Sequence, residues 1–159
     1  MTTPSHPTIE IHRANLTDLE PAVRLFDAYR QFYRLPSEPG RARAFLADRL
    51  RNQDSVIFLG RLAGFPTPVG FVQLYPTFSS VSIGRALVLN DLFVEPAARG
   101  RGIAQALLLR AAAFARETGA RYLELATEIG NGTAQRVYER LGWVRDTEFY
   151  HYSFTLPRP

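Results

Sequence analysis

Arg99-Gly100-Arg101-Gly102-Ile103-Ala104 is the stretch that decides the fold of this chain. It follows the apolar run Leu92-Phe93-Val94 and opens a segment rich in helix-forming residues, from Gln105 to Arg116. A strand that turns through glycines into a helix leaves the first amide N–H groups of that helix without intrahelical partners, at the positive end of its dipole. Glycine also lets a ligand approach the backbone closely. The stretch therefore predicts a binding site for a phosphate group.

The composition is that of one ordinary globular domain. The chain has 159 residues, of which 46% are hydrophobic and 21% charged. We expect a single domain over residues 1–159, with residues 1–7 disordered. No apolar run has the length of a membrane span, and the N-terminus lacks the blocks of a signal peptide, so we expect a cytoplasmic protein without a membrane partner. The absence of cysteine excludes disulfides, thiolate nucleophiles and cysteine-based zinc sites.

The charged residues point to a small anionic ligand. All 19 basic residues are arginines, so a Walker A lysine and Schiff-base chemistry are excluded. The net charge of +4 suits an acidic partner, but the arginines are scattered from Arg13 to Arg158 without a dense run. This scatter disfavours a nucleic-acid surface. His6, His12 and His151 lie on distant segments, so we expect no metal site.

Hydrophobic periodicity predicts a mixed α/β fold. Strands are expected at residues 9–13, 56–62, 69–75, 85–94 and 122–126, followed by two short strands near Val144 and over residues 148–156. Four helices are expected: one begins at a capping box of Thr17 and Glu20 and is broken by Pro36 and Pro39, and the others cover residues 41–50, 103–118 and about 131–141. The order predicts an α/β domain with a mixed central sheet of about six to seven strands flanked by about four helices.

The glycine-rich turn shares features with two nucleotide-binding motifs, and both fit poorly. Gly100-x-Gly102 begins a dinucleotide fingerprint, and Glu124 lies where a ribose-binding acid would fall, but Gln105 replaces the third glycine and too few residues follow for a doubly wound sheet. A P-loop is excluded because the chain has no lysine. The two glycines could also serve only to permit a tight strand-to-helix turn.

Two motifs resemble those of the GNAT superfamily of acyl-CoA N-acyltransferases. Arg99-x-x-Gly102-x-Ala104 is similar to its pyrophosphate motif, and the segment Asn90 to Pro96 is similar to its cofactor-binding strand. Downstream, Asn131-x-x-Ala134-x-x-x-Tyr138-x-x-x-Gly142-Trp143 resembles its second motif. The helix around Tyr29 to Tyr33 and the Tyr150-x-Tyr152 ending resemble a small, histone-acetyltransferase-like branch. The resemblance covers nearly the whole chain and implies the GNAT fold.

The resemblance also implies how acetyl-CoA, the expected co-substrate, would bind. Its pyrophosphate would lie on the amides of residues Gly100 to Ala104, with Arg99 and Arg101 as further donors. Its pantetheine arm would run along Leu92, Phe93 and Val94, as an added strand would. A backbone N–H near Leu92 or Phe93 would hold the acetyl oxygen. Asn131 of the second motif would hydrogen-bond the thioethanolamine end, and Ala134 and Tyr138 are further expected cofactor-binding residues.

Amide formation also needs an acid and a base. Tyr138 is the expected acid, because its ordinary pKa of about 10 lets it protonate a thiolate and stay protonated at neutral pH. The base is left open among Asp91, Glu124, Glu128 and water alone. The expected acceptor-binding residues are Tyr29, Tyr33, Tyr75 and Glu128, with further aromatics at Phe32 and Phe78 and a mobile rim at Pro36 to Gly40.

The sequence thus predicts an N-acetyltransferase that acts on a primary amine in a ternary complex. The alternatives are an enzyme using a longer acyl-CoA and a non-catalytic acyl-CoA sensor of the same fold. Polyamine, amino acid, aminoglycoside and protein amines all stay open as acceptors. The strand-like ending at Glu148 to Leu156 has an edge that needs covering, which favours a homodimer.

Overall fold

The computed structural model describes residues 8–157. The expected disorder of residues 1–7 lies outside this range. The chain has two compact units, residues 1–126 and residues 127–159. No helix within residues 8–157 is both long and apolar enough to span a membrane.

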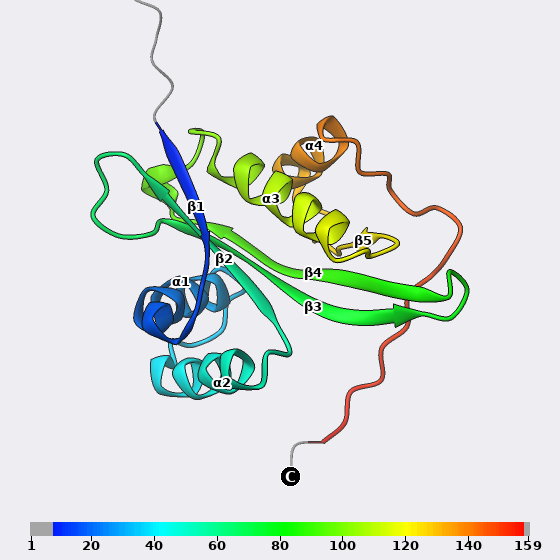
Figure 1. The fold of residues 1–159 in the computed structure, drawn as a ribbon, viewed down its shortest axis with the longest axis horizontal. Helices are drawn as coiled ribbons and strands as arrows, with labels where there is room; N and C mark the ends of the chain where they lie inside the picture. Colours follow the sequence, from blue (N-terminus) through cyan, green and yellow to red (C-terminus); the bar gives the residue numbers. More distant parts are fainter. Residues whose placement is uncertain (1–7, 158–159) are drawn as a thin grey trace, which may run out of the picture. The chain divides into compact units, whose positions relative to one another are not determined.

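The first unit is built on a five-stranded sheet in the order β1-β2-β3-β4-β5 (Figure 1). The first four strands, β1 (Ile9–Arg13), β2 (Val56–Leu62), β3 (Gly70–Ser79) and β4 (Gly84–Val94), run antiparallel to their neighbours. The last, β5 (Leu123–Glu124), is parallel to β4. The strands predicted at residues 9–13 and 56–62 are confirmed at both ends, whereas β3 continues four residues past the predicted end at Tyr75.

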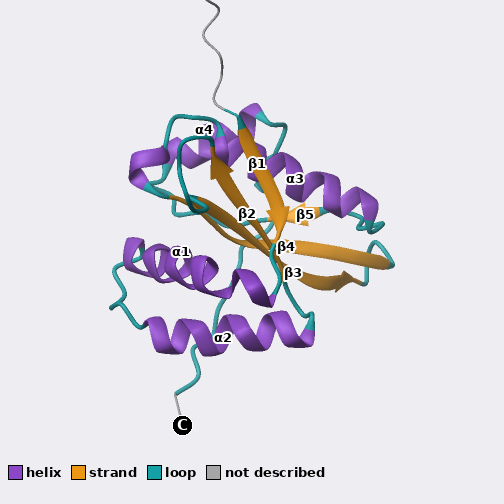
Figure 2. Ribbon diagram, turned by 60° about the vertical axis from the view of Figure 1, so that its left-hand side comes forward, coloured by secondary structure: helices purple, strands orange, loops and turns teal. Residues whose placement is uncertain are grey.

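Helices cover both faces of this sheet. Helices α1 (Leu19–Phe32) and α2 (Pro39–Asn52) lie on one face and α3 (Ile103–Glu117) on the other (Figure 2). Short 3-10 turns at Leu16–Asp18 and Pro96–Ala98 precede α1 and α3.

The capping box predicted at Thr17 and Glu20 is wrong. Asn15 caps the chain instead, accepting from the Thr17 N–H at 2.8 Å, while the Asp18 carboxylate accepts from the Asn15 N–H at 3.0 Å. The capping box begins two residues before the predicted position because asparagine is a stronger N-cap than threonine and because a 3-10 turn precedes the α-helix.

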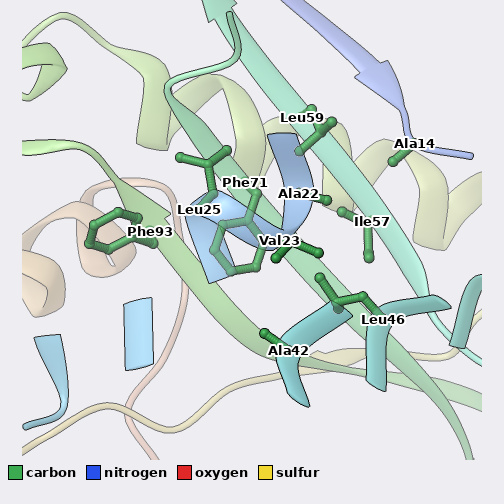
Figure 3. Close-up of a cluster of buried hydrophobic side chains, with 10 residues drawn as sticks. All are labelled: Ala14, Ala22, Val23, Leu25, Ala42, Leu46, Ile57, Leu59, Phe71 and Phe93. Atoms are coloured by element: carbon green, nitrogen blue, oxygen red, sulfur yellow. The ribbon is translucent and has the colours of Figure 1, made fainter. Parts of the chain in front are cut away.

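A hydrophobic core fills the space between the sheet and the α1–α2 layer. Figure 3 shows its ten buried members, which are Ala14, Ala22, Val23, Leu25, Ala42, Leu46, Ile57, Leu59, Phe71 and Phe93. Nine of them come from both helices and from three neighbouring strands, and Ala14 directly follows β1. Burial of their apolar surface fixes α1 and α2 against β2, β3 and β4.

The sheet opens between its last two strands. Only Leu87 and Val88 of β4 pair with β5, opposite Leu123 and Glu124. The strand predicted at residues 122–126 is therefore shorter than expected. Beyond Val88, β4 has an edge that no strand within residues 8–126 covers.

The second unit holds α4 (Gly132–Arg140), and Asn131 caps it by accepting from the Ala134 N–H at 3.2 Å. The strands predicted near Val144 and over 148–156 are wrong, since residues 141–157 contain no strand. An alternating pattern needs a backbone partner to become a strand, and in this segment Phe149, Tyr150, Tyr152 and Phe154 are exposed. The described sheet thus has five strands instead of six or seven, in the predicted mixed α/β architecture.

Candidate active site

A β-bulge in β4 shapes the centre of the first unit. Gln73 of β3 pairs with Asp91, but the next residue, Leu74, pairs with Leu89, so Asn90 is the extra residue. A bulge bends its strand and redirects a side chain. Here the Asn90 carbonyl turns toward α1 and accepts a hydrogen bond from the Tyr29 hydroxyl at 3.3 Å.

Asp91 is a buried carboxylate next to this bulge. It is 3% exposed and accepts hydrogen bonds from the Gln73 amide at 2.6 Å and the Asn90 amide at 3.0 Å. Burial raises the pKa of Asp91 above its ordinary value, and the hydrogen bonds from Gln73 and Asn90 oppose that rise. A carboxylate with a raised pKa accepts a proton more readily, which suits a base.

Two tyrosines flank this carboxylate. Burial, followed by the charge of Asp91, raises the pKa of both Tyr29 and Tyr75 well above the ordinary range of a phenol. Both hydroxyls therefore stay protonated at any physiological pH. The Tyr29 hydroxyl donates to the Asn90 carbonyl, and both rings line the cavity beside Asp91.

A cavity of about 330 Å³ lies beside Asp91 and Asn90. It is lined by Phe26, Tyr29, Arg30, Tyr33, Leu35, Phe45, Tyr75, Asn90 and Asp91. The structure thus brings together Tyr29, Tyr33 and Tyr75, which the sequence predicts as acceptor-binding, with Asp91, which it predicts as a base. Phe32 and Phe78 do not line the cavity, and Phe78 is largely exposed.

The loop that precedes α2 is anchored next to this cavity. The buried Asp27 carboxylate accepts from the Ser37 hydroxyl at 2.6 Å and the Glu38 N–H at 2.8 Å. Glu38 in turn accepts from Arg30 at 2.6 Å and from Arg41 at 2.7 Å. The rim that the sequence predicts to be mobile is therefore tied to α1 at two successive residues.

The glycine-rich turn forms an open helix N-terminus. Gly100 and Gly102 adopt the left-handed region, with φ of 74° and 85°, and no side chain within residues 8–157 caps α3. Close packing fixes the start of the helix, because a Cβ at Gly60 or at Gly70 would come within 3.1 Å of Ile103 Cγ2. The first amides of α3 are thereby held in place without a side-chain partner, as anion binding requires.

The two arginines of the turn behave differently. Arg99 donates from Nε to the Val94 carbonyl at 2.9 Å, and its guanidinium lies 5.7 Å from the Phe93 ring centroid. Its side chain is thus engaged in holding the turn to β4. Arg101 lies over the Phe65 ring at 5.6 Å and is exposed, so it is the more available to an external phosphate.

The uncovered edge of β4 presents backbone groups beside the bulge. The Glu95 N–H donates to the Val69 carbonyl at 2.8 Å, on the β3 side. Backbone groups alternate in direction along an antiparallel strand, so those of Leu92 and Val94 face the edge away from β3. The Val94 carbonyl already accepts from Arg99, so the backbone groups available at this edge are the N–H and carbonyl of Leu92 and the N–H of Val94.

The remaining predicted residues lie apart from this cavity or in the second unit. Glu124 is exposed on β5, opposite Val88, and does not line the cavity. Glu128, Asn131, Ala134 and Tyr138 belong to the second unit, where the Tyr138 ring lies 6.1 Å from the Trp143 ring.

His6 lies outside the described residues, and the two histidines within residues 8–157 have separate carboxylate partners. His12 lies 3.1 Å from Asp18, and His151 lies 3.7 Å from Asp146. Within residues 8–157, no group of three or more potential metal ligands gathers in one place.

Sequence reasoning missed Gln73, Asn90 and Asp27. Gln73 carried a signal, since it is the one polar residue in an otherwise apolar run from Val69 to Tyr75 and is fully buried. A polar side chain at such a position needs a buried partner, here Asp91. Nothing in the sequence marked Asn90 or Asp27. The bulge at Asn90 depends on how β3 pairs with β4, and the role of Asp27 depends on its contacts with the loop before α2.

Comparison with known proteins identifies the family to which this chain belongs. Residues 22–143 match the Acetyltransferase (GNAT) family. The chain is 44% identical over 149 residues to "Uncharacterized N-acetyltransferase YhfO" of Bacillus subtilis (strain 168), covering 94% of this chain and 99% of that protein. The chain therefore belongs to the GNAT acetyltransferase family.

Solved structures agree on the fold. The crystal structure of a probable acetyltransferase has a TM-score of 0.87 at 40% identity and covers 94% of this chain and 99% of that one. The aminoglycoside N-acetyltransferase AAC(6')-Iy, solved with CoA, has a TM-score of 0.77 at 20% identity and covers 98% of this chain and 100% of that one. The finer resemblance to a histone-acetyltransferase-like branch stays a prediction.

Proposed function

We propose that this protein transfers the acetyl group of acetyl-CoA to a primary amine by direct attack in a ternary complex. One observation carries the proposal: a buried carboxylate with a raised pKa, Asp91, lies one residue from Leu92, whose backbone groups face the uncovered edge of β4. A base and an oxyanion donor are thus adjacent on one rigid strand. Membership in the GNAT family supports the same chemistry.

The donor half would rest on the backbone of the first unit. The pyrophosphate would bind the open N-terminus of α3 at Gly100 to Ala104, with Arg101 as an added cation. The pantetheine arm would pair with the β4 edge at Leu92, and the Leu92 N–H would hold the acetyl oxygen. One such donor contributes a factor on the order of 10² to 10³ in rate. A protein of the same fold, AAC(6')-Iy, was solved with CoA.

The acceptor half would rest on the cavity. An alkylammonium with a pKa near 10 must lose a proton before it attacks. Asp91 would accept that proton, and the free amine would attack the thioester carbon. A C–N bond forms, the C–S bond breaks, and the CoA thiolate would take a proton from Tyr138. The attacking nitrogen would then lose its second proton, which restores the Tyr138 hydroxyl. The net reaction converts an ammonium and a thioester into an amide, a thiol and one proton.

The test separates this enzyme from a non-catalytic acyl-CoA sensor. Calorimetry measures acetyl-CoA binding, and CoA release is followed against a panel of primary amines. Binding together with amine-dependent release supports the proposal. Binding without release for every amine would favour the sensor, and a matching series of longer acyl-CoA thioesters tests the remaining alternative.

The predicted homodimer and cytoplasmic location stay part of the proposal. The exposed aromatic side chains at Phe149, Tyr150, Tyr152 and Phe154 give the second unit an apolar surface that a second copy would cover. Sedimentation at micromolar concentration is expected to give a dimer mass, and a monomer mass would contradict it.

A further inference from the structure

The cavity beside Asp91 has mostly apolar or aromatic walls. Six of its nine lining residues share this character: Phe26, Tyr29, Tyr33, Leu35, Phe45 and Tyr75. Their rings pack against one another, with Phe26 stacked on Phe45 at 5.7 Å and Tyr29 edge-on to Tyr33 at 5.0 Å. Packed walls of this kind are preorganised, and they favour a ligand with a flat or compact apolar body.

The cavity offers one place for a positive charge. Asp91 is the only carboxylate among its nine lining residues, and Arg30 is the only cation. The Nη2 of Arg30 donates to Glu38 at 2.6 Å, and its Nη1 is buried without a hydrogen-bond partner among the described residues, so this cation repels an ammonium and leaves Asp91 as its one partner here. A single ammonium can therefore pair with Asp91, helped by the ring faces of the neighbouring tyrosines.

A second ammonium on the same ligand would find no anion among these residues. Placing an unpaired charge against apolar walls is costly. Polyamines and aminoglycosides carry several ammonium groups separated by polar or flexible linkers. The size of the cavity, about 330 Å³, lies at the lower end of the range for small-molecule sites.

From these features we infer that the acceptor is a monoamine: a compact molecule with one primary amine on an aromatic or aliphatic body, of the arylalkylamine type. The inference rests on the proposed function, because it takes this cavity as the acceptor site. Its amine would point at Asp91, and its apolar body would lie between the Tyr33 and Phe45 sides of the cavity.

The first experiment compares three acceptors with the wild-type protein. CoA release is measured with 2-phenylethylamine, spermidine and kanamycin A at saturating acetyl-CoA. We expect kcat/KM for 2-phenylethylamine to be at least about tenfold higher than for either polycation. Equal or faster acetylation of spermidine or kanamycin would overturn the inference and leave the proposed function intact.

If none of the three amines is acetylated, their binding affinities test the inference. Calorimetry with CoA present then measures each amine directly. Binding of 2-phenylethylamine alone supports the inference, whereas binding of a polycation, or of none, overturns it. Acetyl-CoA affinity is measured in a separate titration. A protein that does not bind acetyl-CoA, which would contradict the proposed function, is thereby distinguished from one that does not bind these amines.

A second carboxylate in the wall gives a matched test. Leu35→Glu adds an acid to the cavity at a side chain that is 47% exposed, so folding should tolerate the change. Leu16→Glu is the control, because Leu16 is also 47% exposed but does not line the cavity. We expect Leu35→Glu to shift the kcat/KM ratio toward spermidine by at least about tenfold, with the control ratio unchanged. An unchanged kcat/KM ratio in Leu35→Glu would contradict the inference that the cavity accepts a ligand with one positive charge.

Discussion

Gln73 and Asp91 face each other on strands β3 and β4, both buried, with the Gln73 amide donating to the Asp91 carboxylate at 2.6 Å. This pair lies directly before the bulge at Asn90, where the β4 edge becomes uncovered. The hydrogen bond fixes the carboxylate in one orientation toward the cavity. A base held on a strand is positioned more rigidly than one on a loop.

Asp91 should control both activity and the pH dependence of stability. We expect Asp91→Asn to lower kcat on the order of 100-fold, which is the range of general base catalysis. Because burial raises the pKa of Asp91 in the folded state, wild-type activity should rise with pH as this carboxyl ionises above the ordinary Asp range.

The stability of the fold should change in the opposite direction over the same pH range. A raised folded-state pKa favours the protonated form, so its stabilising contribution is full below the unfolded-state pKa and is lost as pH rises through the folded-state pKa. Melting temperature against pH, compared between the wild type and Asp91→Asn, measures this. The variant should lose that part of the pH dependence. Identical profiles for the two proteins would remove Asp91 from this role.

The glycine-rich turn should bind acetyl-CoA through its backbone. Gly102→Ala places a side chain at φ of 85°, and its new Cβ would lie 3.5 Å from Ile9. We expect a cost of roughly 1–2 kcal/mol in stability and a weaker affinity for acetyl-CoA, measured by calorimetry.

Gly119→Ala is the matched control at the other end of the same helix, with φ of 71° and open space around the new Cβ. It should carry a similar conformational cost and leave acetyl-CoA affinity unchanged. Equal losses of affinity in both variants would mean that the turn has no special role.

The anchor at Asp27 should set the affinity for the acceptor. Asp27→Asn weakens the two hydrogen bonds that hold Ser37 and Glu38 beside the cavity. We expect KM for the amine to rise about tenfold with little change in kcat, because the loop shapes the cavity and does not touch the reacting atoms.

Asp48→Asn serves as its control on the exposed side of α2, where Asp48 pairs only weakly with Arg51. Steady-state kinetics on both variants measure the split between KM and kcat. A fall in kcat with unchanged KM for Asp27→Asn would contradict the anchoring role.

How much of this could be predicted from the sequence depends on the range of the interactions. The turn at Gly100 and Gly102 and the strand at residues 56–62 follow local rules and were predicted. Asp91, Tyr29 and Tyr33 could be named as candidates because the family resemblance marked the strand and the helix. Tyr75 was named as a member of a group of aromatic residues.

The remainder depends on pairing between distant segments. The bulge at Asn90 exists only in the register between β3 and β4, and the anchor at Asp27 only when α1 meets the following loop. The predicted strand at residues 148–156 is wrong for a related reason. Its alternating residues indicate which side chains would share a face, but they do not specify a neighbouring strand to pair with.

Tyr138 should act as the acid that protonates the departing thiolate. We expect Tyr138→Phe to lower kcat on the order of 100-fold while acetyl-CoA affinity stays unchanged. Tyr150→Phe is the control, because Tyr150 belongs to the same unit and is 88% exposed. Unchanged turnover in Tyr138→Phe would exclude the acid role.

Direct transfer in a ternary complex is the central claim, and a single-turnover experiment with isotope-labelled acetyl-CoA tests it most directly. The protein is mixed with labelled acetyl-CoA, first without and then with an amine, and the label is followed by mass spectrometry. Our account predicts no acetylated protein without amine, and equal amounts of acetylated amine and free CoA once amine is added. Acetyl-protein formed before the amine is added, or acetyl-CoA left intact with every amine, would contradict it.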